Sequence, residues 1–171
     1  MKIAKNINPL IIFLVASLAV LAVVPVSAGV STTASVPVTL TVSNDYRAVN
    51  VTLPASLPVE VINGTVITAT DAKITNNSQS SGVRVSEITV TDGAYRVGDY
   101  DRFEGRRTIA LKINGVTTAG SGKMDISSSS FPEIMPGESL GLKYFAKVSN
   151  DGENVNEKEA AHVVFTVTSC S

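Results

Sequence analysis

The sequence predicts an all-β fold, an antiparallel β-sandwich of about eight or nine short strands. Three observations lead to this fold class. Apolar and polar residues alternate with a period of two in several segments, and two Asn-Gly pairs mark tight hairpins. In addition, no segment keeps a helical period over enough residues to form a helix that stands alone.

The clearest alternation runs from Pro136 to Val148. A Pro-Gly turn signal opens it, and from Ser139 onward the apolar side chains share one parity, except for Phe145, which lies with the polar residues. This pattern is typical of a half-buried antiparallel strand, because successive side chains point to opposite faces of a sheet. We expect one continuous strand of roughly 30 Å. Its buried face would carry Leu140, Leu142, Tyr144, Ala146 and Val148.

The first 28 residues have the pattern of a secretory signal peptide. Lys2 and Lys5 precede an uncharged run from Pro9 to Ala28, and small side chains before the end of this run predict cleavage after Ala28. Pro25 would interrupt a helix just before that site. The alternative is an uncleaved membrane anchor, since about 20 apolar residues can span a bilayer. We therefore expect a secreted protein, located outside the cell or on its surface, with no membrane contact after cleavage.

The charge and cysteine content of the mature chain disfavour nucleic acid as a partner and exclude an internal disulfide. Removing Lys2 and Lys5 from the 14 basic side chains leaves 12 against 15 acidic ones, so the mature chain is weakly acidic and nucleic acid is disfavoured. Cys170 is the only cysteine, which excludes an internal disulfide. At a frayed chain end it would be an incidental thiol, and the alternative is a bridge between two molecules.

Behind the leader, residues 29–34 are small and polar and predict a flexible arm, and residues 35–171 form the sandwich domain. The first strand runs from Val36 to Val42, and its Pro37 favours an edge position. An arm that leads into an edge strand allows one subunit to donate this strand to a neighbour's sheet. Alternatively, the strand pairs within its own domain. The assembly residues under the first hypothesis are Val36, Val38, Leu40 and Val42.

Two Asn-Gly pairs predict hairpin turns, because this dipeptide best accepts two positive φ angles. Asn63-Gly64 separates the valines at 59 and 61 from the next strand, and Asn114-Gly115 follows the alternating run Ile109–Ile113. Further strands are predicted at Val49–Leu53, Ala72–Ile74, Met124–Ile126 and Ala161–Val167, and an irregular loop at Asp92–Arg107.

A change of parity predicts a β-bulge. Val83 and Val85 occupy one parity, whereas Ile88 and Val90 occupy the other. A one-residue insertion at Ser86-Glu87 would return all four apolar side chains to the same face.

One segment matches the G-x-S-x-G pattern of a hydrolase nucleophile, at Gly137–Gly141, and Asp151 and His162 follow in the order of an α/β-hydrolase. The context does not fit, because Ser139 opens a predicted β-strand and no helix follows it. His162 is the only histidine and lies inside a predicted strand. We therefore predict no catalytic residues and no enzyme.

Carboxylates in the irregular loop are candidates for a Ca²⁺ site, namely Asp99, Asp101 and Glu104. Arginines alternate with them and the spacing is not that of an EF-hand, so solvated ion pairs are the favoured interpretation. We predict no cofactor. The aromatic residues of the same loop, Tyr95, Tyr100 and Phe103, could form a platform for a carbohydrate.

Three triplets fit the N-glycosylation pattern and begin at Asn50, Asn63 and Asn76. The second and third lie at predicted turns, where a glycan could be accommodated.

Several segments carry a resemblance to known proteins. Ala72–Ser78 with Val83–Val85 resembles the strand, Asn-rich turn and strand unit of immunoglobulin-like domains on prokaryotic surfaces. Pro136–Val148 resembles their alternating strand that begins with PGES. Together with Leu53–Pro58 and Val163–Val167, these segments resemble small secreted proteins of Gram-positive bacteria that are distantly similar to the TasA-like fibre subunits of biofilm matrix. The resemblance implies an immunoglobulin-like sandwich with a structural or adhesive role, and it carries over no catalytic position.

The sequence therefore predicts a non-enzymatic structural protein of the cell surface or matrix, which assembles into filaments by donating its N-terminal strand. The alternative is a monomeric extracellular module that binds carbohydrate or another cell-surface ligand. A secreted hydrolase is disfavoured by the single histidine.

Overall fold

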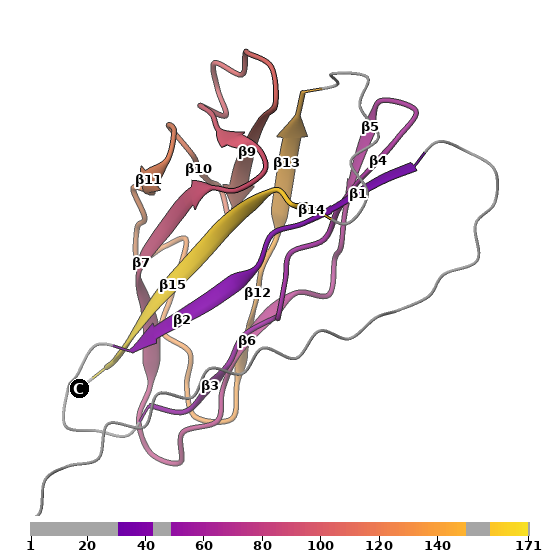
Figure 1. The fold of residues 1–171 in the computed structure, drawn as a ribbon. Helices are drawn as coiled ribbons and strands as arrows, with labels where there is room; N and C mark the ends of the chain where they lie inside the picture. Colours follow the sequence, from indigo (N-terminus) through magenta and orange to yellow (C-terminus); the bar gives the residue numbers. More distant parts are fainter. Residues whose placement is uncertain (1–30, 43–48, 150–157, 171) are drawn as a thin grey trace, which may run out of the picture.

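The computed structural model describes residues 31–42, 49–149 and 158–170, and these residues form an all-β fold with no helix (Figure 1). The predicted fold class is confirmed. None of these residues belongs to a helix that could span a membrane. The strands are β1 (Ser31–Ser35), β2 (Val38–Val42), β3 (Val51–Thr52), β4 (Val59–Ile62), β5 (Thr65–Thr68), β6 (Lys73–Asn76), β7 (Val83–Asp92), β8 (Arg96–Val97), β9 (Thr108–Ile113), β10 (Val116–Thr117), β11 (Gly122–Lys123), β12 (Ser139–Gly141), β13 (Tyr144–Val148), β14 (Lys158–Glu159) and β15 (Ala161–Ser169).

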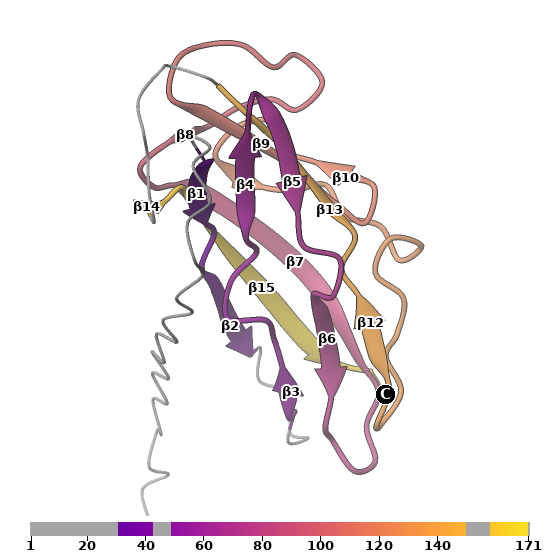
Figure 2. The ribbon, with the colours of Figure 1, turned by 90° about the vertical axis from the view of Figure 1, so that its right-hand side faces the viewer.

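The strands are arranged in two facing layers. One layer is the sheet β11-β7-β15-β2. The other contains the sheets β14-β1-β4-β5 and β12-β6-β3, together with β10-β9-β13, in which β8 also pairs with β9. Figure 2 shows β4, β5 and β6 in front of β7 and β15. The 15 described strands exceed the expected eight or nine, because several predicted strands are interrupted and five described strands have only two residues.

The centre of the first layer is the antiparallel pair β7 and β15. Its pairing runs from Ala161 opposite Asp92 to Ser169 opposite Val83. The register shifts between Thr166 and Val167, because Thr166 pairs with Glu87 and Val167 with Val85, which leaves Ser86 as the extra residue. The predicted bulge is confirmed. It places all four apolar residues of β7 in the core, namely Val83, Val85, Ile88 and Val90.

Both predicted hairpins are confirmed. Asn63 and Gly64 connect β4 to β5 with φ angles of 50° and 79°, and Asn114 and Gly115 connect β9 to β10 with φ angles of 46° and 87°. Two consecutive positive φ angles are typical of the type I′ turn, whose twist matches that of the strands it joins.

The alternating segment from Ser139 to Val148 differs from the prediction of one continuous strand. It forms two strands with different partners, since β12 pairs with β6 and β13 pairs with β9. Between them the Leu142 N–H donates to the Ala72 carbonyl at 2.8 Å, and the Lys143 N–H donates to Asn114 Oδ1 at 2.8 Å. The chain stays extended but changes its partner, so the alternation of buried and exposed side chains is kept.

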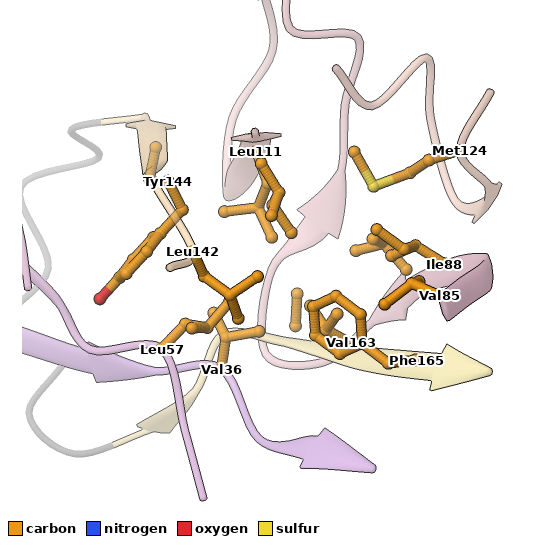
Figure 3. Packing of buried hydrophobic residues seen from close by; sticks show 14 of the residues in the cluster. Val36, Leu57, Val85, Ile88, Leu111, Met124, Leu142, Tyr144, Val163 and Phe165 are labelled. Atoms are coloured by element: carbon orange, nitrogen blue, oxygen red, sulfur yellow. The ribbon is translucent and has the colours of Figure 1, made fainter. Parts of the chain in front are cut away.

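The core lies between the two layers and is mainly aliphatic. Figure 3 shows Leu142 and Leu111 of one layer opposite Phe165 and Val163 of the other. Tyr144 is buried, and its hydroxyl donates to the Pro58 carbonyl at 2.7 Å and accepts from the Ala69 N–H at 3.0 Å. Burial raises the pKa of this hydroxyl. Tyr144 thus links β13 to the ends of β4 and β5.

Candidate functional site

The N-terminal strands cross from one layer to the other (Figure 1). β1 lies antiparallel to β4 and parallel to β14, with Ala34 opposite both Val59 and Lys158. β2 lies parallel to β15, with Val38 opposite Val163. The predicted flexible arm is therefore wrong for residues 31–34, which belong to a paired strand, while residues 29–30 lie outside the described part.

The crossing occurs at Val36-Pro37. Proline has no N–H to donate, so it suits a position where the chain leaves one ladder before it enters the next. Both carbonyls of this dipeptide are paired. The Leu57 N–H donates to the Val36 carbonyl at 2.9 Å, and the Val163 N–H donates to the Pro37 carbonyl at 2.9 Å.

The four predicted assembly residues have different environments. Val36 is fully buried, next to Leu57 in the core (Figure 3). Val38 is half-buried, and Leu40 is 37% exposed although it shares the inward parity of its partner Phe165. The side chain of Val42 lies outside the described part. Val36 is therefore the residue that anchors this segment to the core.

β2 is the last strand of its sheet, as Pro37 predicted. On its outer side, Pro37 forms a bridge with Ser56, and the Val38 N–H donates to the Ala55 carbonyl at 3.3 Å. Beyond Val38 no other described strand pairs with this side. An edge of this kind presents backbone donors and acceptors that another strand could use.

The disfavoured Ca²⁺ candidates, Asp99, Asp101 and Glu104, do not form a metal cluster. In the described part of the chain no group of three or more His, Cys, Asp or Glu side chains is placed to hold a metal. Asp99 Oδ1 instead accepts from the N–H groups of Arg102 at 3.0 Å and Asp101 at 2.8 Å, and these bonds lower the pKa of its carboxyl. Asp101 accepts from Thr117 Oγ1 at 3.4 Å, and Glu104 is exposed.

The residues of the hydrolase-like pattern are not brought together. Ser139 begins β12 and its hydroxyl lies 2.8 Å from that of Thr75, whereas His162 lies in β15 of the other layer, 4.0 Å from Glu159. Asp151 lies outside the described residues. Within the described part, Ser139 and His162 have no geometry for proton transfer between them.

The three aromatic residues considered as a carbohydrate platform differ in their surroundings. Tyr95 is 7% exposed and belongs to the core. The Lys147 Nζ atom lies 4.4 Å from the centre of the Tyr100 ring and donates to the Tyr100 carbonyl at 2.6 Å, so one face of that ring is occupied by a cation. Phe103 is half-buried.

One glycosylation candidate is also corrected. Asn76 is fully buried, and its side-chain nitrogen donates to the carbonyls of Ser81 and Ile134, both at 2.9 Å. In the folded protein this nitrogen is not accessible to a glycan. Asn50 and Asn63 are exposed.

Cys170 is held in place, in contrast to the frayed end that we expected. It follows β15 directly, and its N–H donates to the Gly82 carbonyl at 2.8 Å. Partial burial raises the pKa of its thiol, which reduces its nucleophilicity at neutral pH. The predicted cleavage site at Ala28 lies outside the described residues.

Sequence reasoning missed a surface hollow of about 380 Å³ on the layer of β3 and β6. It lies between the β3–β4 and β5–β6 connections, and Asp71 and Lys73 provide its charged groups. The two connections are distant in sequence and carry no motif, so no local signal could have brought them together.

Comparisons with protein-family models, with curated proteins and with solved structures gave no match for this chain.

Proposed function

We propose that the protein is a non-enzymatic structural component of the cell surface or extracellular matrix, and that its subunits assemble by exchanging their N-terminal strands. The observation that carries this proposal is the placement of β1 and β2. The connection between them supplies a fully buried anchor, Val36, yet β2 occupies the outermost position of its sheet.

The anchor and the edge have complementary roles in such an exchange. Full burial of a valine side chain contributes about 1.5–3 kcal/mol, so a neighbour's sheet without its own Val36 would expose an apolar slot. A neighbour's strand could fill that slot with the same register, in which Val38 faces Val163 and Leu40 faces Phe165. Every contact of the closed monomer would be re-formed between two molecules.

The position of the exchanged segment supports the same mechanism. With cleavage after Ala28, β1 begins at the third residue of the mature chain. A strand near a chain end can leave and enter a sheet without threading the rest of the molecule through it. Repeated head to tail, such a heterologous contact produces a filament.

Paired cysteines provide a direct test. In a Cys170→Ser background, Thr39→Cys and Val164→Cys molecules are unfolded, refolded together and oxidised. Thr39 faces Val164 in the parallel ladder. Neighbouring strands lie about 4.8 Å apart, within the roughly 4.4–6.8 Å that a disulfide spans. Strand exchange therefore yields the Thr39→Cys/Val164→Cys heterodimer.

Thr89→Cys is the matched control for this experiment, because Thr89 faces Val164 from the opposite side and is one strand further from Thr39. Heterodimer yields equal to those of the Thr39→Cys and Thr89→Cys mixture would contradict strand exchange. Negative-stain microscopy gives the second readout, since deletion of residues 31–42 should remove filaments.

One observation favours a second function, a monomeric module that binds carbohydrate or another cell-surface ligand. The hollow beside Asp71 and Lys73 has a volume within the range typical of small-ligand sites. A protein that stays monomeric by light scattering at all concentrations would favour this alternative over assembly.

A further inference from the structure

The chain contains two Asn-Gly pairs in the same type of turn, and their asparagine side chains are in opposite environments. Asn63 is exposed, and among the described residues no hydrogen bond involves its side-chain amide. Asn114 is half-buried, and its side chain makes three hydrogen bonds. Because the local sequence and the backbone angles match, any difference in reactivity must come from these surroundings.

We propose that Asn63 is a site of spontaneous deamidation in the folded protein and that Asn114 is protected from the same reaction. In this reaction the main-chain nitrogen of Gly64 loses its proton and bonds to Cγ of Asn63. The bond from Cγ to Nδ2 breaks, and ammonia leaves. Water then opens the cyclic imide at either carbonyl, which gives aspartate or isoaspartate.

The surroundings of Gly64 permit this attack. A glycine has no side chain beside its nitrogen, and a Cβ added at Gly64 would meet no atom within 4 Å, so the space around the turn is open. The same is true of Gly115. Glycine also allows the turn to leave its native angles at low cost. The two glycines are therefore equivalent, and neither explains a difference in rate.

The asparagine side chains provide that difference. Asn114 Nδ2 donates to the carbonyls of Ser130 at 3.3 Å and Gly141 at 3.2 Å, and Asn114 Oδ1 accepts from the Lys143 N–H at 2.8 Å. These bonds hold the amide where β9, β12 and β13 meet. To react, Asn114 must break them and leave the Lys143 N–H and two carbonyls without partners, whereas Asn63 breaks none.

Deamidation of Asn63 would alter the turn at the end of the ladder between β4 and β1. Asn63 follows Ile62, which faces Ser31 in the ladder between β4 and β1. Each conversion adds one negative charge at this tip, and isoaspartate also lengthens the main chain. The inference itself depends only on the two turns and not on strand exchange.

The experiment compares the two sites within one molecule. Full-length folded protein, made in a host that does not glycosylate Asn63, is held in mildly alkaline buffer and sampled over time. Peptide mass spectrometry then follows both asparagines. We expect Asn63 to convert at least about tenfold faster than Asn114, since each of the hydrogen bonds that Asn114 must break slows it severalfold.

Denatured protein is the control, because the two rates should converge once the fold no longer holds Asn114. Asn63→Gly keeps a residue that accepts a positive φ and should abolish the slow acidic shift in isoelectric point. Conversion of Asn114 at a rate equal to or above that of Asn63 in the native state would overturn the proposal. So would a folded protein in which Asn63 stays intact while the denatured chain reacts at both sites.

Discussion

The two neighbours of β15 hold it in different ways. On one side, β7 pairs with it in antiparallel register along its whole length, and the inward side chains of β7 are completely or almost completely buried. On the other side, β2 pairs with it in parallel over five residues, and both Thr39 and Leu40 are exposed. Parallel pairing is slightly weaker per residue, and exposed side chains add little apolar burial.

Under the proposed strand exchange, this difference would separate the contact that stays closed from the contact that opens. A strand that must leave its sheet during assembly needs an interface that opens without unfolding the rest. The contact between β2 and β15 has these properties, although Val36 must also leave the core when β2 opens. The contact between β7 and β15 forms the centre of the fold.

The largest expected effect is the truncation of an aliphatic side chain on β7. Ile88→Ala removes a fully buried side chain and should lower the free energy of unfolding by about 2–5 kcal/mol, because it loses apolar burial and leaves a cavity. Urea denaturation measures this change.

Leu40→Ala is the matched variant on β2 and removes a side chain of the same size. Since Leu40 is 37% exposed, the expected loss is roughly 1 kcal/mol or less. If Ile88→Ala and Leu40→Ala lowered the free energy of unfolding equally, β7 and β2 would contribute equally to stability, which would contradict the difference described above.

Two features of the strands beside β15 could be predicted, the bulge in β7 and the edge position of β2. Each depends on residues that are close together in the sequence. The parity change between Val85 and Ile88 predicted the bulge, because only one extra residue returns both to the same face. Pro37 predicted an edge, because it cannot complete a ladder in a central strand.

The features that could not be predicted depend on distant partners. Residues 31–34 are small and polar and were predicted to belong to an arm, yet they lie in β1, which pairs with β4 on one side and with β14 on the other. Likewise, the split of Ser139–Val148 arises because Ala72 and Asn114 engage the chain at its middle. At the candidate site, sequence could list the alternating residues but not that, among those whose side chains are described, only Val36 is fully buried.

An intermediate effect is expected in hydrogen exchange. Amides in a fragment that covers β2 should exchange earlier than those in a fragment that covers β7, because the β2 contact can open locally while β7 opens only with the whole sandwich. Mass spectrometry of the native protein after exchange in heavy water measures both fragments.

β15 is the internal reference for this experiment, since it pairs with both strands. The β15 amides that donate to β7 should stay protected while those of β2 exchange, whereas an amide on the β2 side, such as the Val163 N–H that donates to the Pro37 carbonyl, should exchange together with β2. If the amides of β2 and β7 exchanged their hydrogens at one common rate, β2 would open only on global unfolding. Transfer of this strand between subunits would then require an unfolded subunit.

The smallest expected effect concerns the other end of the same sheet, where β11 covers β7. There Lys123 Nζ lies 2.6 Å from Glu87 Oε2, and both groups are partly in solvent. The hydrogen bond from Lys123 is the main cause that lowers the pKa of Glu87, and Thr89 Oγ1 adds a second bond at 3.1 Å. Lys123→Ala should therefore raise the pKa of Glu87 part of the way to its ordinary value, as measured by NMR titration.

The sign of the pH dependence follows from this lowered pKa. A carboxyl with a lower pKa in the folded state stabilises the fold at pH values above its unfolded pKa, and this contribution is lost as the pH falls through the folded pKa. Lys123→Ala should thus reduce stability slightly at neutral pH and leave it unchanged in acid, whereas Lys143→Ala, on the other layer, should leave the Glu87 titration unchanged. A Glu87 pKa that did not respond to Lys123→Ala would show that this pair contributes nothing at the β11 edge.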